Sequence, residues 1–339
     1  MSIQPEHLDG PEIGRPDPAR RPVGLAQRLR RRRARRGLTG VRTTDGLRLH
    51  VEEDGDAASA VTLVFAHGFS ARLGEFSDQR AGLRERCRMV LYDHRGHGRS
   101  GWGRARNATV DQLGLDLLAV LEAHAPTGPV VLLGHSMGGI TVMSLARQRP
   151  ELFGSRIVGV FLLATSSGDL ASTGPLGLFV KLLARMRLLT LYLFLLRLGS
   201  PALERLRQRG TPAGRRLVER YLFGTADAAP VLVDEVQRML EETPWTITTS
   251  FYTSLFALDE VASLQAMRGI PVTVLVGAED RLTPPGHSHK IAGQLPNARL
   301  VVVPGAGHCV NITRPDLVNE EIAHLLDRVQ GTSRQAAGS

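Results

Sequence analysis

Ser136 has the clearest chemical setting of any residue in this sequence. It is the centre of Gly134-His135-Ser136-Met137-Gly138, a G-x-S-x-G pattern that follows an apolar run and precedes a helical one. A serine on a strained strand-to-helix turn projects its hydroxyl from the sheet, and the two glycines avoid collisions with the neighbouring backbone. Because the chain holds 36 glycines, the five residues alone are a weak signal. Their strand–turn–helix context favours a nucleophile at Ser136.

A candidate base and a candidate acid stand at matching places further along the chain. His308 and Asp280 each come just after an apolar run predicted as a strand. A serine hydroxyl needs an imidazole to take its proton, and the imidazole needs a carboxylate to fix its tautomer. The chain order Ser, Asp, His is a known order for such a triad. Glu279 and Asp169, the latter after the preceding strand, are the alternative acids.

Acyl transfer also needs hydrogen-bond donors for the oxyanion of the transition state. The segment His67-Gly68-Phe69 directly follows another apolar run, so the backbone N–H groups of Phe69 and Met137 are the predicted pair. Gly68 allows the loop to pass close to its neighbours. His135 has two interpretations: it orients the site, or it packs beside the turn.

The elements that must position these residues are recognisable from hydrophobic pattern. Apolar runs without strict alternation predict strands buried on both faces, and helical segments such as 109–124 lie between them. A short hairpin around Asp45-Gly46 precedes them. The strand runs are residues 61–66, 88–93, 129–134, 157–164, 271–277 and 300–304. This alternation predicts an α/β fold with a doubly wound, mostly parallel sheet.

The chain divides into five predicted segments. No buried-strand run occurs between about residues 172 and 259, so we expect a helical cap inserted into the sheet domain. The expected segments are a disordered Arg-rich leader at 1–37, a first core part at 38–170, the cap at 171–259, a second core part at 260–330 and a disordered tail at 331–339.

The charge of the chain is concentrated in the leader. The formal net charge is +9, and the segment Arg20–Arg36 holds nine arginines and no acid, so the rest of the chain sums to 9 − 9 = 0. Such a segment is a solvated tail or a peripheral contact with an anionic membrane. Nucleic acid is the least favoured partner, because no aromatic residues accompany the arginines.

Cofactors and metals are not expected. The segment 93–98, Asp-His-Arg-Gly-His-Gly, contains metal-ligand residue types, but a Gly-rich turn held by Asp and Arg hydrogen bonds explains it better. Cys87 and Cys309 are the two cysteines of the sequence, which is too few for a disulfide framework. No ordinary secretory signal is visible, so we expect a cytoplasmic protein, at most peripheral to a membrane.

Together these motifs resemble the α/β-hydrolase superfamily over about residues 40–330, within it the esterase, monoacylglycerol lipase-like and lysophospholipase-like branch and also cofactor-free haloperoxidases. The motifs are HG at 67–68, DHRGHGRS at 93–100, GHSMGG at 134–139, GAEDRLTPP at 277–285 and GAGH at 305–308. The resemblance implies the α/β-hydrolase fold, with nucleophile, acid and base at Ser136, Asp280 and His308. The leader lies outside the family domain, and the cap has no matching motif.

The leading hypothesis is a serine hydrolase that cleaves a carboxylic ester with a hydrophobic acyl group through an acyl-enzyme, a small-molecule substrate. Thioesterase, carbon–carbon hydrolase and perhydrolase or haloperoxidase chemistry use the same triad and stay open. A serine at the turn disfavours dehalogenase and epoxide hydrolase chemistry. The rival of another class is a non-catalytic ligand-binding protein that keeps the fold.

Overall fold

The computed structural model describes the chain from the first strand to the C-terminal helix, with gaps in the inserted region. The residues that it describes are 39–170, 179, 182–183, 185–200, 204, 215–216, 218–224 and 229–337. The Arg-rich leader, with Arg20–Arg36, lies outside them.

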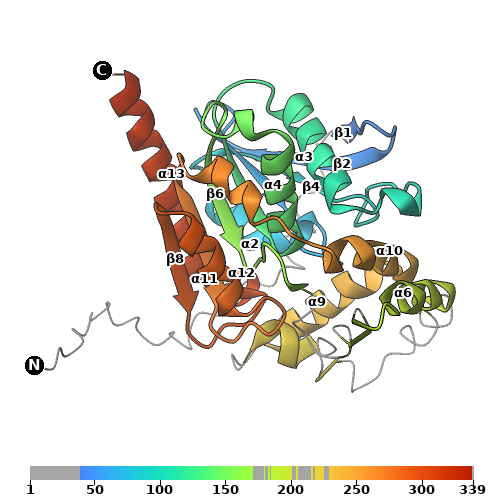
Figure 1. Cartoon of the computed structure of the whole chain (residues 1–339). Coiled ribbons are helices and arrows are strands. Elements are labelled where there is room, and N and C mark those ends of the chain that lie inside the picture. Colours follow the sequence, from blue (N-terminus) through green and yellow to red (C-terminus); the bar gives the residue numbers. More distant parts are fainter. Residues whose placement is uncertain are drawn as a thin grey trace, which may run out of the picture. The chain divides into compact units, whose positions relative to one another are not determined.

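One eight-stranded sheet forms the centre of the domain (Figure 1). Its spatial order is β1-β2-β4-β3-β5-β6-β7-β8. The hairpin of β1 and β2 turns at Asp45-Gly46, and β2 pairs antiparallel with β4, whereas every later pair is parallel. The bounds are β1 Thr39–Arg42, β2 Arg48–Gly55, β3 Thr62–Ala66, β4 Arg88–Tyr92, β5 Val130–His135, β6 Ile157–Leu163, β7 Val272–Gly277 and β8 Ala298–Val303. The predicted doubly wound, mostly parallel fold is confirmed.

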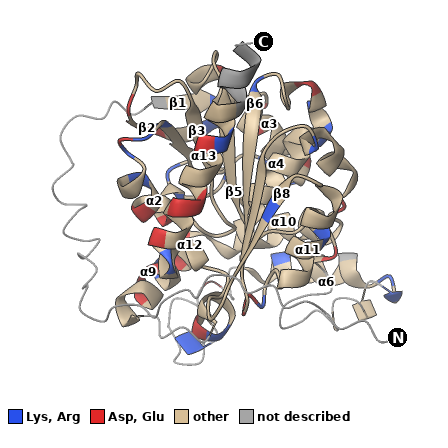
Figure 2. Cartoon of the chain, turned by 90° about the vertical axis from the view of Figure 1, so that its left-hand side faces the viewer, with Lys and Arg blue, Asp and Glu red and all other residues tan. Residues whose placement is uncertain are grey.

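Helices cover both faces of this sheet (Figure 2). Successive side chains of β3 show why: Val64 and Ala66 pack into one core, Leu63 and Phe65 into the other. The first core holds α3 (Val110–His124), α4 (Met137–Gln148) and α11 (Pro285–Gln294), and the second holds α2 (Ser77–Gly82), α12 (Val310–Thr313) and α13 (Pro315–Ala337). Strands β3, β5 and β7 are buried along their whole length, on both faces, which explains their apolar runs in the sequence.

The described residues between β6 and β7 are helical. They include α6 (Leu189–Leu198), the π-helix η5 (Glu219–Phe223), α9 (Pro230–Glu242) and α10 (Trp245–Phe256). The two ends of this insert meet, because Gly168 and Asp259 form an isolated antiparallel bridge. Helices α6, α9 and α10 lie at the end of the sheet toward which the arrow of β8 points (Figure 1).

The predicted disordered tail at 331–339 is wrong for most of its length, because α13 continues to Ala337. The helix is anchored by Val318, Ile322 and Leu325, which are buried in the second core. Good helix formers at 334–337 extend an established helix at little cost, and Gly331 costs only about 1 kcal/mol. No helix in the described ranges has the length and hydropathy that a membrane span requires.

Candidate active site

Ser136 occupies the turn between β5 and α4 with φ 50° and ψ −114°. This is a strained backbone for a residue other than glycine. Neighbouring elements hold it there: its N–H donates to the Leu163 carbonyl over 2.9 Å, and its carbonyl accepts the Thr165 hydroxyl over 2.7 Å. Strand β6 therefore fixes the serine from the side, at the carboxyl end of the sheet.

The glycines on either side of Ser136 are required by close backbone approach. A Cβ on Gly138 would overlap the Ala66 carbonyl at the end of β3, and one on Gly134 would overlap the carbonyl of Gly138. The turn therefore packs against itself and against β3 in a way that only glycine permits. Both residues occupy the places predicted from the G-x-S-x-G pattern.

His308 and Asp280 meet at the ends of β8 and β7. Nδ1 of His308 lies 2.8 Å from Oδ2 of Asp280, and both side chains are buried. Burial alone would raise the pKa of Asp280, but the His308 ring and the hydrogen bonds from Thr283 outweigh it, so the pKa lies below its usual value. An ionised Asp280 keeps the proton of His308 on Nδ1, which leaves Nε2 as the basic atom of the ring.

The two alternative acids, Asp169 and Glu279, are placed differently from Asp280. Asp169 forms an exposed ion pair with Lys290, with 3.1 Å between Oδ2 and Nζ. Glu279 is half-buried beside Asp280, and it is the Asp280 carboxylate that lies 2.8 Å from Nδ1 of His308. The structure thus brings His308 together with Asp280 rather than with either alternative.

His308 reaches the neighbourhood of Ser136 through His135. The two imidazole rings have centroids 5.0 Å apart, and Nε2 of His135 lies 3.2 Å from the His308 carbonyl oxygen. Because His135 precedes Ser136 directly, this contact links the loop that carries His308, the predicted base, to the turn that carries Ser136. The three residues of the predicted triad therefore converge at one end of the sheet.

The two predicted oxyanion donors follow the neighbouring strands β3 and β5. Phe69 lies in the loop after β3, and Met137 begins α4, where the first N–H groups of a helix have no partner within it. Among the described residues, neither N–H donates a hydrogen bond to the protein. The N–H of Gly68, by contrast, donates to Glu75 Oε1 over 2.9 Å.

A buried cluster of His67, His94 and His97 supports the loop of residues 67–70, called the oxyanion loop here after its predicted role. His67 Nε2 accepts the His94 N–H over 2.8 Å, and the His67 ring donates from Nδ1 to the Gly68 carbonyl over 2.7 Å. The ring of His97 packs 5.8 Å from that of Phe69, measured between centroids. Burial lowers the pKa of His94 to about 3 and that of His97 to about 4, so both rings are neutral near pH 7.

The segment 93–98 forms a turn held by its own side chains. Asp93 accepts the N–H groups of Leu73 and Arg99, each over 2.8 Å, and Arg95 binds Asp116 through two hydrogen bonds of 2.6 and 2.7 Å. In the described part of the chain, no group of three or more His, Cys, Asp or Glu residues is placed to hold a metal ion.

Comparison with known proteins identifies the family. The model of the family described as "Alpha/beta hydrolase family" matches residues 63–321. The chain belongs to this α/β-hydrolase family.

Similar α/β hydrolases differ in the reaction that their names give. A protein of Caulobacter sp. (strain K31), named as a candidate carbamate hydrolase, is 26% identical over 84% of this chain and 97% of its own length. The sn-1-specific diacylglycerol lipase ABHD11 of Mus musculus is 26% identical over 80% of this chain and 83% of its own. A thermophilic esterase from Thermogutta terrifontis superposes with a TM-score of 0.67 at 24% identity, over 87% and 99% of the two chains, and this likeness shows the fold alone.

Three residues of the α/β-hydrolase site were not predicted from sequence. Thr283 contacts Asp280, Glu75 contacts His135, and Thr165 contacts the backbone of Ser136. Only Thr283 carried a local signal, since it lies three residues after the acid, the usual spacing of a side chain that closes such a turn. The other two contacts join residues 60 and 29 positions apart.

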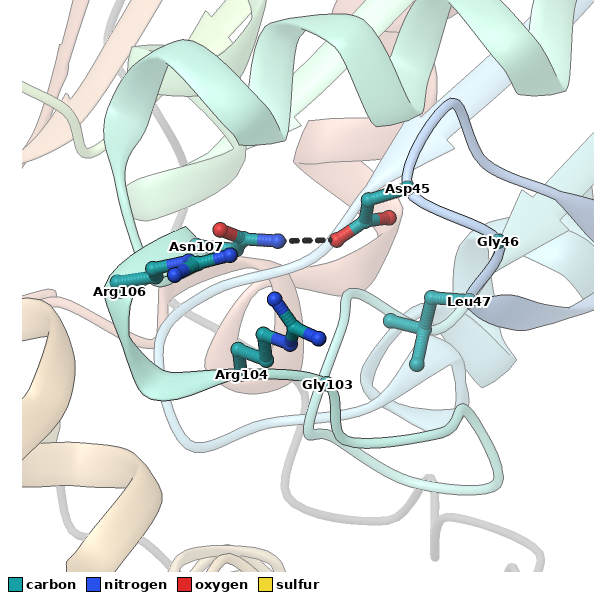
Figure 3. A pocket seen from close by; sticks show the side chains of 7 residues that line it. All are labelled: Asp45, Gly46, Leu47, Gly103, Arg104, Arg106 and Asn107. Atoms are coloured by element: carbon teal, nitrogen blue, oxygen red, sulfur yellow. Dashed lines mark hydrogen bonds between the residues drawn. The ribbon is translucent and has the colours of Figure 1, made fainter.

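A surface hollow of this α/β hydrolase is separate from the site. It encloses about 430 Å³ between the β1–β2 turn and the 3₁₀ helix η2 (Ala105–Asn107) (Figure 3). In the same view Asn107 donates a hydrogen bond to Asp45, and Arg104 and Arg106 line the hollow. None of its lining residues belongs to the predicted triad or to the oxyanion loop.

Proposed function

We propose that the chain is a serine hydrolase that cleaves a carboxylic ester with a hydrophobic acyl group. The observation that carries the proposal is the buried pair of His308 and Asp280, 2.8 Å apart, at the same sheet end as the strained turn of Ser136. Membership of the α/β-hydrolase family supports a hydrolytic reaction. That the substrate is a carboxylic ester, and that its acyl group is hydrophobic, is our proposal.

In the proposed mechanism, Ser136 Oγ attacks the carbonyl carbon while Nε2 of His308 takes its proton. Asp280 stabilises the imidazolium that forms. The N–H groups of Phe69 and Met137 bind the oxyanion, and each such donor contributes about 10²- to 10³-fold in rate. His308 then protonates the leaving alcohol. Water, activated by the same imidazole, releases the acid from the acyl-enzyme.

Aromatic residues beside the oxyanion loop support a hydrophobic acyl group. The ring centroid of Phe69 lies 6.0 Å from that of Phe251 and 6.0 Å from that of Tyr252. Both of these residues belong to α10 of the insert. Tyr252 in turn stacks on Phe256 at 5.4 Å. An acyl chain that enters beside Phe69 would therefore meet apolar surface, which is what such pockets usually offer.

The test is hydrolysis of p-nitrophenyl esters from acetate to palmitate by the wild type and by Ser136→Ala. We expect activity that vanishes in Ser136→Ala, survives in the control Ser59→Ala on a loop before β3, and has an optimum at a medium or long chain. Mass spectrometry should find a fluorophosphonate on Ser136. An enzyme that hydrolyses p-nitrophenyl carbamates or thioesters faster would replace the ester by that substrate class. No labelling and no turnover would favour the ligand-binding alternative.

We also propose a peripheral contact with anionic membranes, supplied in part by Arg20–Arg36. A described feature supports it: Leu191, Phe194 and Leu198 lie at helical spacing on α6 and are 54%, 61% and 69% exposed. The sequence from 170 to 203 contains no acidic residue. Exposed apolar residues whose charged neighbours in the sequence are all cations suit an anionic lipid surface.

Vesicle sedimentation tests this contact with the full chain. We expect binding to vesicles of phosphatidylglycerol that weakens when Leu191, Phe194 and Leu198 become Asn, and again when the nine leader arginines become Gln. Val231→Asn on α9, also exposed, is the matched control. Equal binding to phosphatidylcholine vesicles would contradict the charge argument. A dimer that forms as the protein concentration rises would instead show that the exposed residues of α6 contact a second copy of the chain.

A further inference from the structure

Glu75 and His135 form a buried ion pair beside the proposed triad. Nδ1 of His135 lies 3.2 Å from Oε1 of Glu75, and each side chain is only 4% exposed. Glu75 belongs to the 3₁₀ helix η1 (Leu73–Phe76), whereas His135 ends β5. The proposed mechanism gives neither residue a role, yet burying an ion pair is costly unless its geometry is well satisfied.

Both nitrogens of the His135 ring face acceptors. Nδ1 faces the Glu75 carboxylate, and Nε2 faces the His308 carbonyl oxygen at 3.2 Å. A neutral imidazole can donate from one nitrogen only, so when Glu75 is an ionised carboxylate that accepts, both hydrogen bonds form together only if the ring carries two protons. Burial alone would lower the pKa of His135, but Glu75 and the His308 carbonyl outweigh it and the pKa is raised. The other titratable groups near the ring are the His308 imidazole, with its centroid 5.0 Å away, Asp280 and the neutral His67.

The same carboxylate also holds the oxyanion loop. Oε1 of Glu75 accepts the Gly68 N–H over 2.9 Å. The fit leaves no room for a side chain, since a Cβ on Gly68 would lie 2.9 Å from Nδ1 of His135. The backbone carbonyl of Glu75 accepts Nδ2 of Asn311 over 3.2 Å, and Asn311 follows His308 by three residues. Glu75 thus contacts segments on both sides of the serine.

We infer that the Glu75–His135 ion pair positions the three loops that carry Phe69, Ser136 and His308 relative to one another. Glu75 holds the oxyanion loop through its hydrogen bond with the Gly68 N–H. His135 is covalently joined to Ser136, and its ring contacts the His308 carbonyl in the loop after β8, called the base loop here. Both members act through other residues, so they are positioning residues. The catalytic consequence rests on the proposed function, whereas the protonation of His135 does not.

The first test compares Glu75→Gln with Glu260→Gln. Glu260 is a matched control, because its side chain is also 4% exposed and also paired, with Arg147. Loss of the charge at Glu75 should lower kcat about 10- to 100-fold with KM changed less than about twofold, because misplaced reacting groups slow the chemical step. Glu260→Gln should keep kcat. Equal losses in both variants would overturn the inference.

The dependence of kcat on pH gives a second measurement, which would not change if Glu75 only stabilised the fold. His135 has a raised pKa, so its cation is present below that pKa and is lost as the pH rises through it. Glu75→Gln removes the stabilising charge, so the alkaline loss of kcat should begin at lower pH. A double-mutant cycle with His135→Gln should be strongly non-additive, because both changes break one pair. An unchanged alkaline limb or additive effects would overturn the inference.

Nitrogen-15 NMR of the full chain tests the protonation without any substrate. The His135 ring, assigned by its disappearance in His135→Gln, is titrated from about pH 5 to 9 and should keep protons on both nitrogens up to a higher pH in the wild type than in Glu75→Gln. Equal titration of the ring in the two proteins would overturn the inference. Failure of the proposed function would show separately, as ester hydrolysis that persists in Ser136→Ala or is absent from the wild type.

Discussion

Thr283 donates its hydroxyl to Asp280 Oδ2 over 2.8 Å, and the same oxygen lies 2.8 Å from Nδ1 of His308. The other oxygen, Oδ1, accepts the backbone N–H groups of Leu282 and Thr283 at 2.8 and 2.9 Å. Four donors thus fix both oxygens of one buried carboxylate. This set of bonds determines the direction in which His308 can point, because the ring must present Nδ1 to Oδ2.

Thr283→Val should weaken this arrangement without removing the acid. A hydrogen bond to a charged group contributes about 1.5 to 3 kcal/mol, and about 1.4 kcal/mol is tenfold in rate, so we expect kcat to fall about tenfold. The pKa of Asp280 should rise toward its usual value, because one of the hydrogen bonds that lower it is lost. Steady-state kinetics measures kcat, and carbon-13 NMR of the Asp280 carboxylate measures its pKa.

The control for this change is Thr313→Val. Thr313 donates to the Cys309 carbonyl inside α12 and does not contact Asp280. It should leave the kinetic profile where it is. A Thr283→Val enzyme with wild-type kcat and an unchanged Asp280 pKa would show that the backbone donors alone hold Asp280.

The fold could be predicted because local pattern and burial agree in this domain. Strand β5 reads as an unbroken apolar run, and all six of its residues are buried. Helix α3 begins where its sequence predicts, since the hydroxyl of Thr109 accepts the Gln112 N–H over 3.1 Å. In both cases the residues that indicate the element belong to the element or lie directly beside it in the sequence.

Contacts between distant segments could not be predicted in the same way. Glu75 is 60 residues from His135, and no local pattern marks it as a partner. The two interpretations of His135 could be separated only by its neighbours in space. The end of α13 was missed for a related reason: the helix is stabilised by packing before residue 331, which composition at 331–339 does not record.

The buried histidines beneath the oxyanion loop should make stability fall in mild acid. His94 and His97 have pKa values lowered to about 3 and about 4, so below their ordinary value near 6.5 the unfolded chain takes up protons that the native state does not. At pH 5 each should cost about 2 kcal/mol of the free energy of unfolding relative to pH 7. The raised pKa of His135 acts in the opposite direction: its stabilisation is complete below about pH 6.5 and is lost as the pH rises through the raised pKa, so it offsets part of this fall close to pH 7. Urea unfolding at pH 7 and pH 5 measures the difference.

His97→Asn separates this effect from acid unfolding in general. The amide nitrogen of Asn can replace Nδ1 of His97, which donates to the Arg95 carbonyl over 2.9 Å, and it does not titrate. The variant should lose less stability than the wild type between pH 7 and pH 5. The exposed His289, changed to Asn, should behave as the wild type. An equal pH dependence in all three proteins would contradict a neutral buried His97.

Asp116→Asn should be one of the most destabilising conservative changes. Arg95 is 1% exposed and makes two hydrogen bonds to Asp116, with Asp45 as its second carboxylate. Removing one charge from a buried pair costs about 3 to 5 kcal/mol when the other charge is left uncompensated, and here Asp45 offsets part of that cost. The midpoint of urea unfolding should fall accordingly, while kcat at low temperature should change less than about threefold. The exposed pair of Arg149 and Glu151 offers the control Glu151→Gln, which should hardly move the midpoint.

The base loop should depend on its contact with the π-helix η5. The Cys309 N–H donates to the Leu222 carbonyl over 2.8 Å, and a Cβ on Gly307 would lie 2.5 Å from both the Gly224 nitrogen and the Phe223 carbonyl carbon. These atoms are backbone and cannot rotate away. Gly307→Ala should therefore push His308 from its place and lower kcat about 10²-fold, since small displacements of reacting groups are expensive.

Overpacking of this kind should cost the fold only about 1 to 3 kcal/mol, so the variant should remain folded by circular dichroism. Gly293→Ala is the matched control, because no atom lies within 4 Å of its added Cβ in α11 and the change favours the helix. It should keep kcat and unfold at an equal or higher temperature. A Gly307→Ala enzyme with normal kcat would mean that His308 keeps its position without contact between its loop and η5, and the insert would then influence substrate binding rather than the base.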